Sequence, residues 1–285
     1  MRLAMIDVDG DGQLAVILDD RAVLLRDLSA EAPASMVDAL NLPAPEQELY
    51  RIAAERTARG IPLAEVRWRQ PIERPGKILC LGLNYQSHVS ETGHTVPDYP
   101  LIFLRTPDSF VAHGEPLLAT PLSPTFDYEA ELAVIIGKAA WQVNEAHALD
   151  HVCGYSLIND GTIREYQRKA GPQWTIGKNF HRSGSFGPWV VPANALPAGG
   201  KGLRLRGILN GETVQDASTS DMIFDVARTI AILSQTIRIE PGDVIASGTP
   251  SGVGNARTPK LFMQPGDRFD VEVEHIGRLS NPVAL

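Results

Sequence analysis

The stretch Asp127-Tyr128-Glu129-Ala130-Glu131-Leu132-Ala133-Val134-Ile135-Ile136-Gly137 carries more structural and chemical information than any other part of the sequence. Its apolar, β-branched run predicts a strand over residues 129–137, in which alternate side chains share a face. Glu129 and Glu131 then lie on one face, about 6–7 Å apart, while the apolar face packs on a core. Adjacent carboxylates repel unless a positive group lies between them, and a divalent cation with oxygen ligands meets that need. The pair alone leaves a second possibility open, a solvent-facing acidic edge strand.

A third carboxylate follows the next apolar run. Asp160 comes directly after residues 153–159 and precedes Gly161, and a strand end is a good position from which to present a ligand. Arg164 and Gln167 come four and seven residues later, a spacing that one face of a helix aligns. Taken alone, Asp160 also fits the N-cap of a helix.

Two further polar groups have the composition of a reactive site. His88 and Glu91 lie three residues apart, which fits a general-base pair whose carboxylate raises the basicity of the imidazole. An exposed ion pair is the alternative. Residues 247–254, SGTPSGVG, follow a predicted strand and gather backbone N–H groups and hydroxyls. Such a loop binds an anion or stabilises an enolate, or it is a plain tight turn.

The remaining C-terminal sequence consists of short strand-like runs between Gly and Pro turns. The 25 Gly and 21 Pro are spread without a repeat. Asn210-Gly211 predicts a two-residue hairpin. A helix is predicted after residue 219, capped by Ser220, with its buried stripe at Met222, Val226, Ile230, Leu233 and Ile237. Further strands are predicted over residues 78–83, 101–104, 153–159, 189–192, 203–210, 243–247 and 268–275. The chain is therefore expected to be mostly β with some α.

The first 70 residues have a different pattern. Strand-like runs at 3–6 and 14–18 flank an Asp-Gly turn at residues 9–12, and residues 34–40 and 45–59 have helical patterns. Pro71, Pro75 and Gly76 then indicate a linker. We expect a small N-terminal α/β domain over residues 1–70 and a catalytic domain over residues 71–285.

Composition excludes several classes of function. The 26 Lys and Arg against 34 Asp and Glu give a net charge of −8 with no basic run, which argues against a nucleic-acid partner. No apolar run approaches the 18 or more residues of a membrane span, and no signal-peptide pattern opens the chain. The only cysteines, Cys80 and Cys153, lie in apolar runs and are expected to be buried free thiols. A cytoplasmic location is therefore expected.

Several familiar motifs are absent or incomplete. Residues 7–12 imitate the start of a calcium loop, but its twelfth position is Leu18 instead of a bidentate Glu, so a hairpin turn is the better interpretation. His147 and His151 have helical metal-ligand spacing without the Glu of H-E-x-x-H, which favours a surface or capping role. The nucleophile elbow and the Walker signature are both missing.

Taken together and in this order, these segments resemble the fumarylacetoacetate hydrolase superfamily. The resemblance covers about 180 residues, and its E-x-E, N-D and G-T-P-S-G-V-G elements are highly specific. It implies a mixed β-sandwich roll with a small, variable N-terminal domain, and it implies a homodimer. It also implies one Mg²⁺ or Mn²⁺ per chain.

By resemblance, roles are carried onto matching positions of this sequence. The metal triad maps onto Glu129, Glu131 and Asp160. The catalytic positions map onto His88, Glu91 and Lys178. The substrate-binding positions map onto Arg105, Arg164, Gln167 and Thr249. The chain departs from the usual pattern at Glu165, at Arg105, where a lysine is frequent, and at His181, where an Asp is frequent; these changes leave the metal site intact and affect the substrate.

The function expected from this resemblance is metal-dependent hydrolysis of a carbon–carbon bond in a 2,4-dioxo acid, an acylpyruvate or another diketo acid. His88, oriented by Glu91, would activate water, and Lys178 would help to stabilise the released enolate. The alternative on the same site is decarboxylation of a 2-oxo acid such as oxaloacetate, or an isomerisation. A non-catalytic small-acid-binding protein is the hypothesis from another class.

Overall fold

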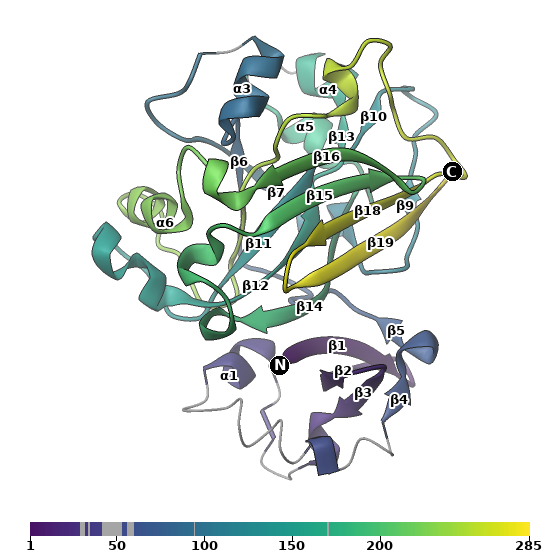
Figure 1. Cartoon of the computed structure of the whole chain (residues 1–285), viewed down its shortest axis with the longest axis vertical. Coiled ribbons are helices and arrows are strands. Elements are labelled where there is room, and N and C mark those ends of the chain that lie inside the picture. Colours follow the sequence, from purple (N-terminus) through teal and green to yellow (C-terminus); the bar gives the residue numbers. More distant parts are fainter. Residues whose placement is uncertain (29–31, 34, 42–52, 56–59, 94, 170) are drawn as a thin grey trace.

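A large mixed sheet runs through the centre of the fold (Figure 1). The computed structural model describes all residues except 29–31, 34, 42–52, 56–59, 94 and 170. Among the described residues, ten strands follow one another across the sheet, and β5 (Arg67–Trp68) and β8 (Phe110–Val111) pair beside that path. In spatial order the ten are β4 (Ile61–Pro62), β3 (Arg21–Leu24), β2 (Asp11–Leu18), β1 (Arg2–Val8), β14 (Gly184–Pro192), β12 (Val152–Asn159), β11 (Ala130–Ile136), β17 (Val244–Ala246), β6 (Ile78–Gly82) and β7 (Leu101–Arg105).

Strand β11 lies inside this sheet, with β12 on one side and β17 on the other. All seven of its residues are buried. Its alternate residues join two different cores, Leu132 and Val134 on one face and Ala133 and Ile135 on the other. The strand predicted from its apolar run is confirmed, and the acidic edge strand is excluded because Glu131 is only 1% exposed.

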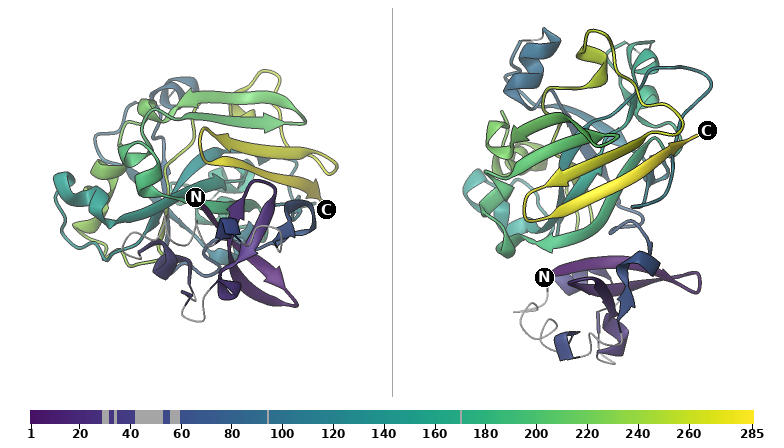
Figure 2. Two further views of the ribbon diagram at one scale, coloured as in Figure 1. Left: turned by 60° about the horizontal axis from the view of Figure 1, so that its bottom comes forward. Right: turned by 45° about the vertical axis from the view of Figure 1, so that its right-hand side comes forward.

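A second sheet covers one face of the first (Figures 1 and 2). The two sheets enclose the larger core, where Tyr128 stacks on Phe269 with ring centroids 4.9 Å apart. The mostly β sandwich expected from the sequence is therefore confirmed. The second sheet consists of β16 (Glu212–Ser218), β15 (Arg204–Leu209), β18 (Arg268–Val273), β19 (Gly277–Ala284) and β9 (Leu117–Leu118). A short pair, β10 (Phe126–Asp127) and β13 (Thr162–Ile163), stands apart from both.

The predicted hairpins are present. Asp9 and Gly10 have positive φ angles of 54° and 94° at the turn between β1 and β2, and Asp7 accepts a hydrogen bond from the Gly10 N–H. Asn210 and Gly211 likewise have φ angles of 52° and 85° between β15 and β16. The calcium-like sequence is thus a hairpin turn.

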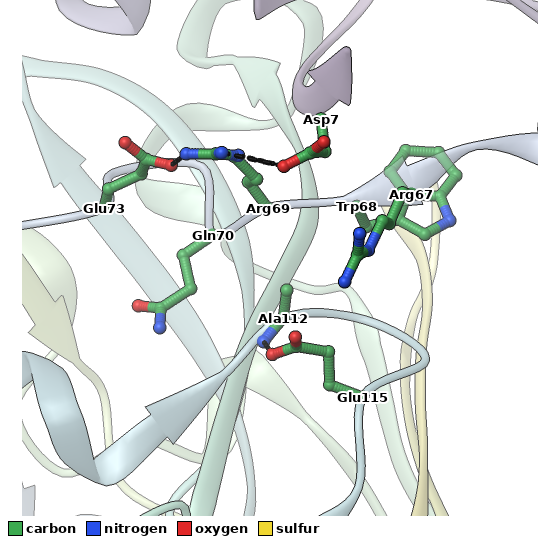
Figure 3. A pocket seen from close by; sticks show the side chains of 8 residues that line it. All are labelled: Asp7, Arg67, Trp68, Arg69, Gln70, Glu73, Ala112 and Glu115. Carbon is green, nitrogen blue, oxygen red and sulfur yellow. Dashed lines mark hydrogen bonds and ion pairs between the residues drawn. The ribbon is translucent and has the colours of Figure 1, made fainter. Parts of the chain in front are cut away.

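The N-terminal strands extend the large sheet, because β1 pairs with β14 at Leu3 and Val190. Helix α1 (Met36–Leu40) follows them, as residues 34–40 predict, whereas most of the helix predicted over residues 45–59 lies outside the described residues. Arg69 bonds to Asp7 and Glu73 beside a cavity of about 290 Å³ between these strands and the residues after β8 (Figure 3). The division of the chain at residue 70 stays a prediction.

One helix prediction is wrong in its start. Helix α6 covers Val226–Ser234, and its N-cap is Asp225, whose side chain accepts a hydrogen bond from the Arg228 N–H. Ser220 lies instead in a 3₁₀ turn, Thr219–Asp221. The intervening residues bond to Asn84, which accepts from the Phe224 N–H and donates to the Phe224 carbonyl. These long-range bonds hold residues 222–224 out of the helix.

The sheet topology brings the candidate residues to the same end of several neighbouring strands. Strands β6 and β17 are parallel, and both β12 and β17 run antiparallel to β11. The carboxyl ends of β6, β12 and β17 therefore meet the amino end of β11. Helices α3 (Gln86–Thr92), α4 (Arg164–Lys169) and α5 (Thr175–Lys178) gather at this end, at the top of Figure 1. None of the described helices is long and apolar enough to cross a membrane.

Candidate metal centre and active site

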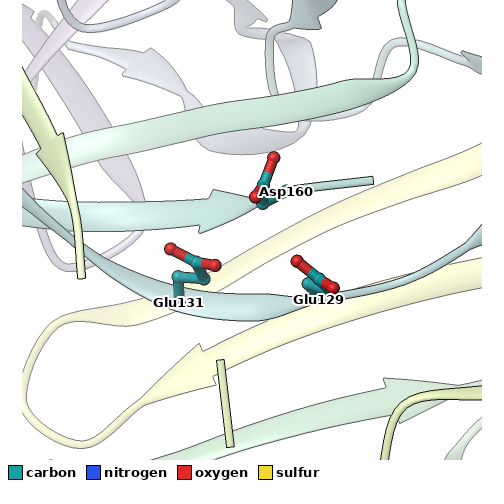
Figure 4. A group of neighbouring side chains, drawn as sticks. All are labelled: Glu129, Glu131 and Asp160. Atoms are coloured by element: carbon teal, nitrogen blue, oxygen red, sulfur yellow. The ribbon is translucent and has the colours of Figure 1, made fainter. Parts of the chain in front are cut away.

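Three carboxylates meet at the amino end of β11 (Figure 4). Glu129, Glu131 and Asp160 each offer an oxygen, and these oxygens lie within 4.8 Å of one another. The three residues are 5%, 1% and 0% exposed. Glu131 lies on β11 and Glu129 directly precedes the strand, and β12 ends opposite them, where the Asp160 N–H donates to the Glu129 carbonyl. The triad predicted from spacing and resemblance is therefore assembled.

Buried cations surround this triad. Lys178 Nζ lies 2.6 Å from both Glu129 Oε2 and Asp160 Oδ2. Arg164 pairs with Glu129 and with Asp127, at 2.6 and 2.7 Å. Each cation bridges two carboxylates, which stabilises charges that would otherwise be costly to bury.

The three carboxylates differ in their electrostatic environment. Burial would raise the pKa of Glu129, but the charges of Arg164 and Lys178 hold it at about 2. Burial raises the pKa of Glu131 well above its usual range, and the like charges of Asp160 and Glu129 raise it further. Glu131 is thus the ligand whose negative charge has least support from the protein itself.

The donor set fits a hard divalent cation. Mg²⁺ and Mn²⁺ prefer oxygen ligands, and three converging carboxylates supply them. Glu131 accepts one hydrogen bond from the Gly248 N–H, at 2.8 Å, and belongs to no ion pair among the described residues. A cation at the triad would compensate the repulsion from Asp160 and Glu129 that raises the pKa of Glu131.

A cavity of about 500 Å³ opens near the triad; none of the three carboxylates is among its lining residues, and Arg164, which lines it, connects it to Glu129. Its lining includes the predicted residues His88, Glu91, Arg164 and Gln167. Leu83, Trp174 and Val253 supply apolar wall, and Arg168 and Asn255 are among its polar residues. The structure therefore brings four predicted site residues together around one space large enough for a small organic acid.

His88 and Glu91 form the predicted pair on helix α3. His88 Nδ1 lies 3.4 Å from Glu91 Oε2; His88 is 7% exposed, whereas Glu91 is exposed, so the pair is buried only on its histidine side. The Glu91 carboxylate also accepts from the Gly252 N–H, at 2.9 Å. Gly252 has a φ of 102°, and a Cβ there would lie 2.1 Å from the Val214 carbonyl oxygen, so this contact requires glycine.

Comparison with known proteins agrees with this arrangement. Residues 77–284 match the sequence profile described as fumarylacetoacetate (FAA) hydrolase C-terminal. The chain belongs to the fumarylacetoacetate hydrolase family. Oxaloacetate tautomerase YisK of Bacillus subtilis is 38% identical over 225 residues, which is 78% of this chain and 74% of that protein.

Solved structures of the family match the whole chain. The fumarylacetoacetate hydrolase of Exiguobacterium antarcticum superimposes with a TM-score of 0.83 at 30% identity, covering 100% of this chain and 99% of that chain. A 5-carboxymethyl-2-hydroxymuconate delta-isomerase of Mycobacterium smegmatis gives 0.79 at 30% identity, with the same coverage. This chain is an enzyme of the family, and its relatives are named for more than one reaction.

Two residues given substrate-binding roles by resemblance to the family lie away from the cavity lining. Arg105 is 3% exposed and donates to Asp160 Oδ1, to the Ser109 and Ser183 hydroxyls and to the carbonyls of Ser109 and Gly161. Thr249 donates to the Ala130 carbonyl and accepts from Gln215. Both side chains hold the walls of the site in these contacts. Lys178 likewise is not among the cavity-lining residues, and its Nζ bonds to Glu129 and Asp160.

Sequence reasoning missed Asp127, Asn84 and Gln215. Asp127 is 0% exposed and accepts from the N–H groups of Tyr128, Gly254 and Asn255 and from Arg164. It continues the period-2 series of Glu129 and Glu131, a signal that was available. Asn84 and Gln215 bond mainly to backbone groups distant in sequence, and no spacing rule marks them.

The other polar features do not join this site. His147 and His151 lie in an exposed 3₁₀ helix, where His147 faces Asp150 at 3.4 Å. Cys80 and Cys153 are buried free thiols, as predicted.

Proposed function

We propose that this chain is a divalent-metal-dependent enzyme that interconverts the keto and enol forms of a 2-oxo dicarboxylic acid such as oxaloacetate. The observation that carries the proposal is a buried carboxylate triad and a His–Glu pair beside one cavity, on a chain 38% identical to an oxaloacetate tautomerase. Isomerisation was the alternative on this site in the sequence analysis, and the named relatives favour it over the hydrolase.

Tautomerisation moves one proton between C3 and the oxygen on C2. His88 is the candidate base, because its Nδ1 faces Glu91 and leaves Nε2 to take the C3 proton. A divalent cation held by Glu129, Glu131 and Asp160 would supply Lewis acidity at the C2 oxygen. Lys178, between Glu129 and Asp160, adds positive charge near the same oxygen. Gln167 accepts from Arg164 through its oxygen, at 3.1 Å, so its amide N–H₂ remains able to orient the substrate.

Hydrolysis of a 2,4-dioxo acid is the second candidate. The same His88–Glu91 pair would take a proton from water instead of from C3, and a solved structural relative is named a hydrolase. Decarboxylation of oxaloacetate passes through the same enolate and needs no attacking water.

The test records loss of the enol form and formation of cleavage products separately. Enol-oxaloacetate is mixed with the protein in Mg²⁺, in Mn²⁺ and in chelator, and the loss of enol absorbance is recorded while products are identified by mass. We expect metal-dependent ketonisation that is faster than pyruvate formation. Pyruvate and carbon dioxide appearing at the rate of enol loss would establish decarboxylation instead, and cleavage of acylpyruvates alone would establish hydrolysis.

Matched histidine variants identify the base. His88→Gln should reduce ketonisation at least 100-fold, within the range for general-base loss. His147→Gln removes an exposed histidine outside the cavity and should leave the rate unchanged. Equal rates for both variants would refute the role of His88. The expected homodimer and cytoplasmic location stay predictions, and light scattering tests the former.

A further inference from the structure

The charge inventory around the triad limits how many substrate carboxylates this site can hold. Among the described buried residues, four carboxylates surround the centre against three cations. The carboxylates are Asp127, Glu129, Glu131 and Asp160; the cations are Arg105, Arg164 and Lys178. A divalent cation would leave one positive charge, which a single substrate carboxylate neutralises. A second carboxylate needs another cation.

One arginine lines the cavity without a carboxylate partner. Arg164 is committed to Asp127 and Glu129. Arg168, one helical turn further along α4, also lines the cavity and forms no ion pair with any carboxylate that the structure describes. Its guanidinium lies 3.5 Å from Asn255 Oδ1, across the cavity mouth. The buried Arg164 therefore lies at the inner end of the cavity, next to the triad, and the exposed Arg168 lies at its outer end.

The position of Arg168 is tied to the centre. The Asn255 N–H donates to Asp127 Oδ2, at 2.9 Å, and the same carboxylate oxygen accepts from Arg164 Nε, at 2.7 Å. Asp127 thus fixes the residue that contacts Arg168 relative to the arginine beside the triad. Asn255 is neutral, so it orients Arg168 without neutralising it.

We propose that Arg168 binds the distal carboxylate of a dicarboxylic 2-oxo acid and so selects dicarboxylates over monocarboxylates. This inference rests on the proposed function for the identity of the 2-oxo acid head. A bidentate guanidinium–carboxylate contact suits the end of the substrate that leaves the buried centre and reaches the open mouth. Arg168 is a specificity determinant and takes no part in proton transfer.

Lys260 offers a matched control for Arg168. Its Nζ donates to the same Asn255 Oδ1, at 2.8 Å, and it is exposed, but it does not line the cavity. Removing either side chain deletes one positive charge from the same patch. A difference between the two variants therefore measures direct contact, because general electrostatic attraction would be reduced alike.

The test uses two stable probes of equal chain length, 2-oxoglutarate and 2-oxopentanoate, with calorimetry in saturating Mg²⁺. We expect the wild type to prefer 2-oxoglutarate. Arg168→Gln should weaken 2-oxoglutarate binding about tenfold and leave 2-oxopentanoate unchanged, a size typical of one charge-assisted contact. Arg168→Lys should recover part of the loss, and Lys260→Gln should change neither ligand.

Three results would overturn the proposal: equal small losses in Arg168→Gln and Lys260→Gln, equal losses for both probes, or no dicarboxylate preference in the wild type. Because binding is measured without turnover, failure of the tautomerase proposal is separate. The tautomerase proposal alone fails if the wild type prefers 2-oxoglutarate through Arg168 but does not ketonise oxaloacetate.

Discussion

Replacing Asp127 by Asn tests whether one buried carboxylate organises the site. Asp127 Oδ1 accepts from the N–H groups of Tyr128 and Gly254, and Oδ2 accepts from the Asn255 N–H and from Arg164 Nε. Asparagine presents one oxygen and one N–H₂ group. Each oxygen of Asp127 accepts from two donors, so in either orientation of the asparagine amide two of the four donors face its N–H₂ group. Arg164 then keeps only Glu129 as its anionic partner.

The magnitude follows from these contacts. Breaking a buried ion pair by removing one partner costs about 3–5 kcal/mol. At roughly 2–4 °C per kcal/mol for a chain near this size, the melting temperature should fall by about 10 °C. Thermal unfolding of the metal-free protein measures this, with Asp150→Asn as control, because Asp150 has a side chain 72% exposed and should change stability by less than about 0.5 kcal/mol.

Activity supplies the second readout of the same variant. Loss of Asp127 releases both Arg164 and the Gly254–Asn255 backbone, so turnover should decrease more than the loss of folded protein explains. An Asp127→Asn protein that melts within 1 °C of wild type, with unchanged KM, would refute the argument that this carboxylate holds the site together.

Three further perturbations have outcomes of defined sign. Glu131→Gln should abolish metal-dependent turnover and weaken Mn²⁺ binding, measured by calorimetry, by more than the roughly 10–100-fold cost of losing a residue that only hydrogen-bonds to a metal ligand. It should also raise the melting temperature of the metal-free protein, because it removes the repulsion of Glu131 with Asp160 and Glu129. Arg105→Lys should destabilise the fold by about 2–4 kcal/mol in urea unfolding, since an ammonium cannot reproduce five directed bonds. Burial lowers the pKa of His113 from 6.5 to about 4, so its contribution to stability is complete above pH 6.5 and is lost as pH falls toward 4, by up to about 1.4 kcal/mol per pH unit; His113→Gln should show a shallower decline of melting temperature over that range.

The sequence predicted those parts of the site that local spacing determines. The period of two along β11 fixed the shared face of Glu129 and Glu131, and the strand end fixed Asp160. Arg105 shows where such reasoning stops. Its partner Asp160 is 55 residues away, so only the tertiary fold, which brings the last residue of β7 to the residue after β12, decides that Arg105 supports a ligand instead of lining the cavity.

The helix boundary has the same physical cause. Ser220 and Asp225 are both good caps, and the apolar spacing from Met222 favours the earlier one. The choice is made by Asn84, 140 residues away from Phe224, whose buried amide bonds to both the N–H and the carbonyl of Phe224 and keeps that residue out of the helix. A local pattern cannot contain that information.

Ketonisation, decarboxylation and hydrolysis share one enolate, so the triad cannot distinguish them. What differs is which proton His88 takes and whether a water reaches the distal carbon. Both depend on helices α3 and α4, through the Glu91 contact with Gly252 and the placement of Arg168 at the mouth. The proposed contact of Arg168 with a distal carboxylate would orient the substrate relative to His88, which lines the same cavity. On this proposal, variants around the cavity mouth such as Arg168→Gln should change products before they change metal binding, and product analysis beside Mn²⁺ calorimetry measures both.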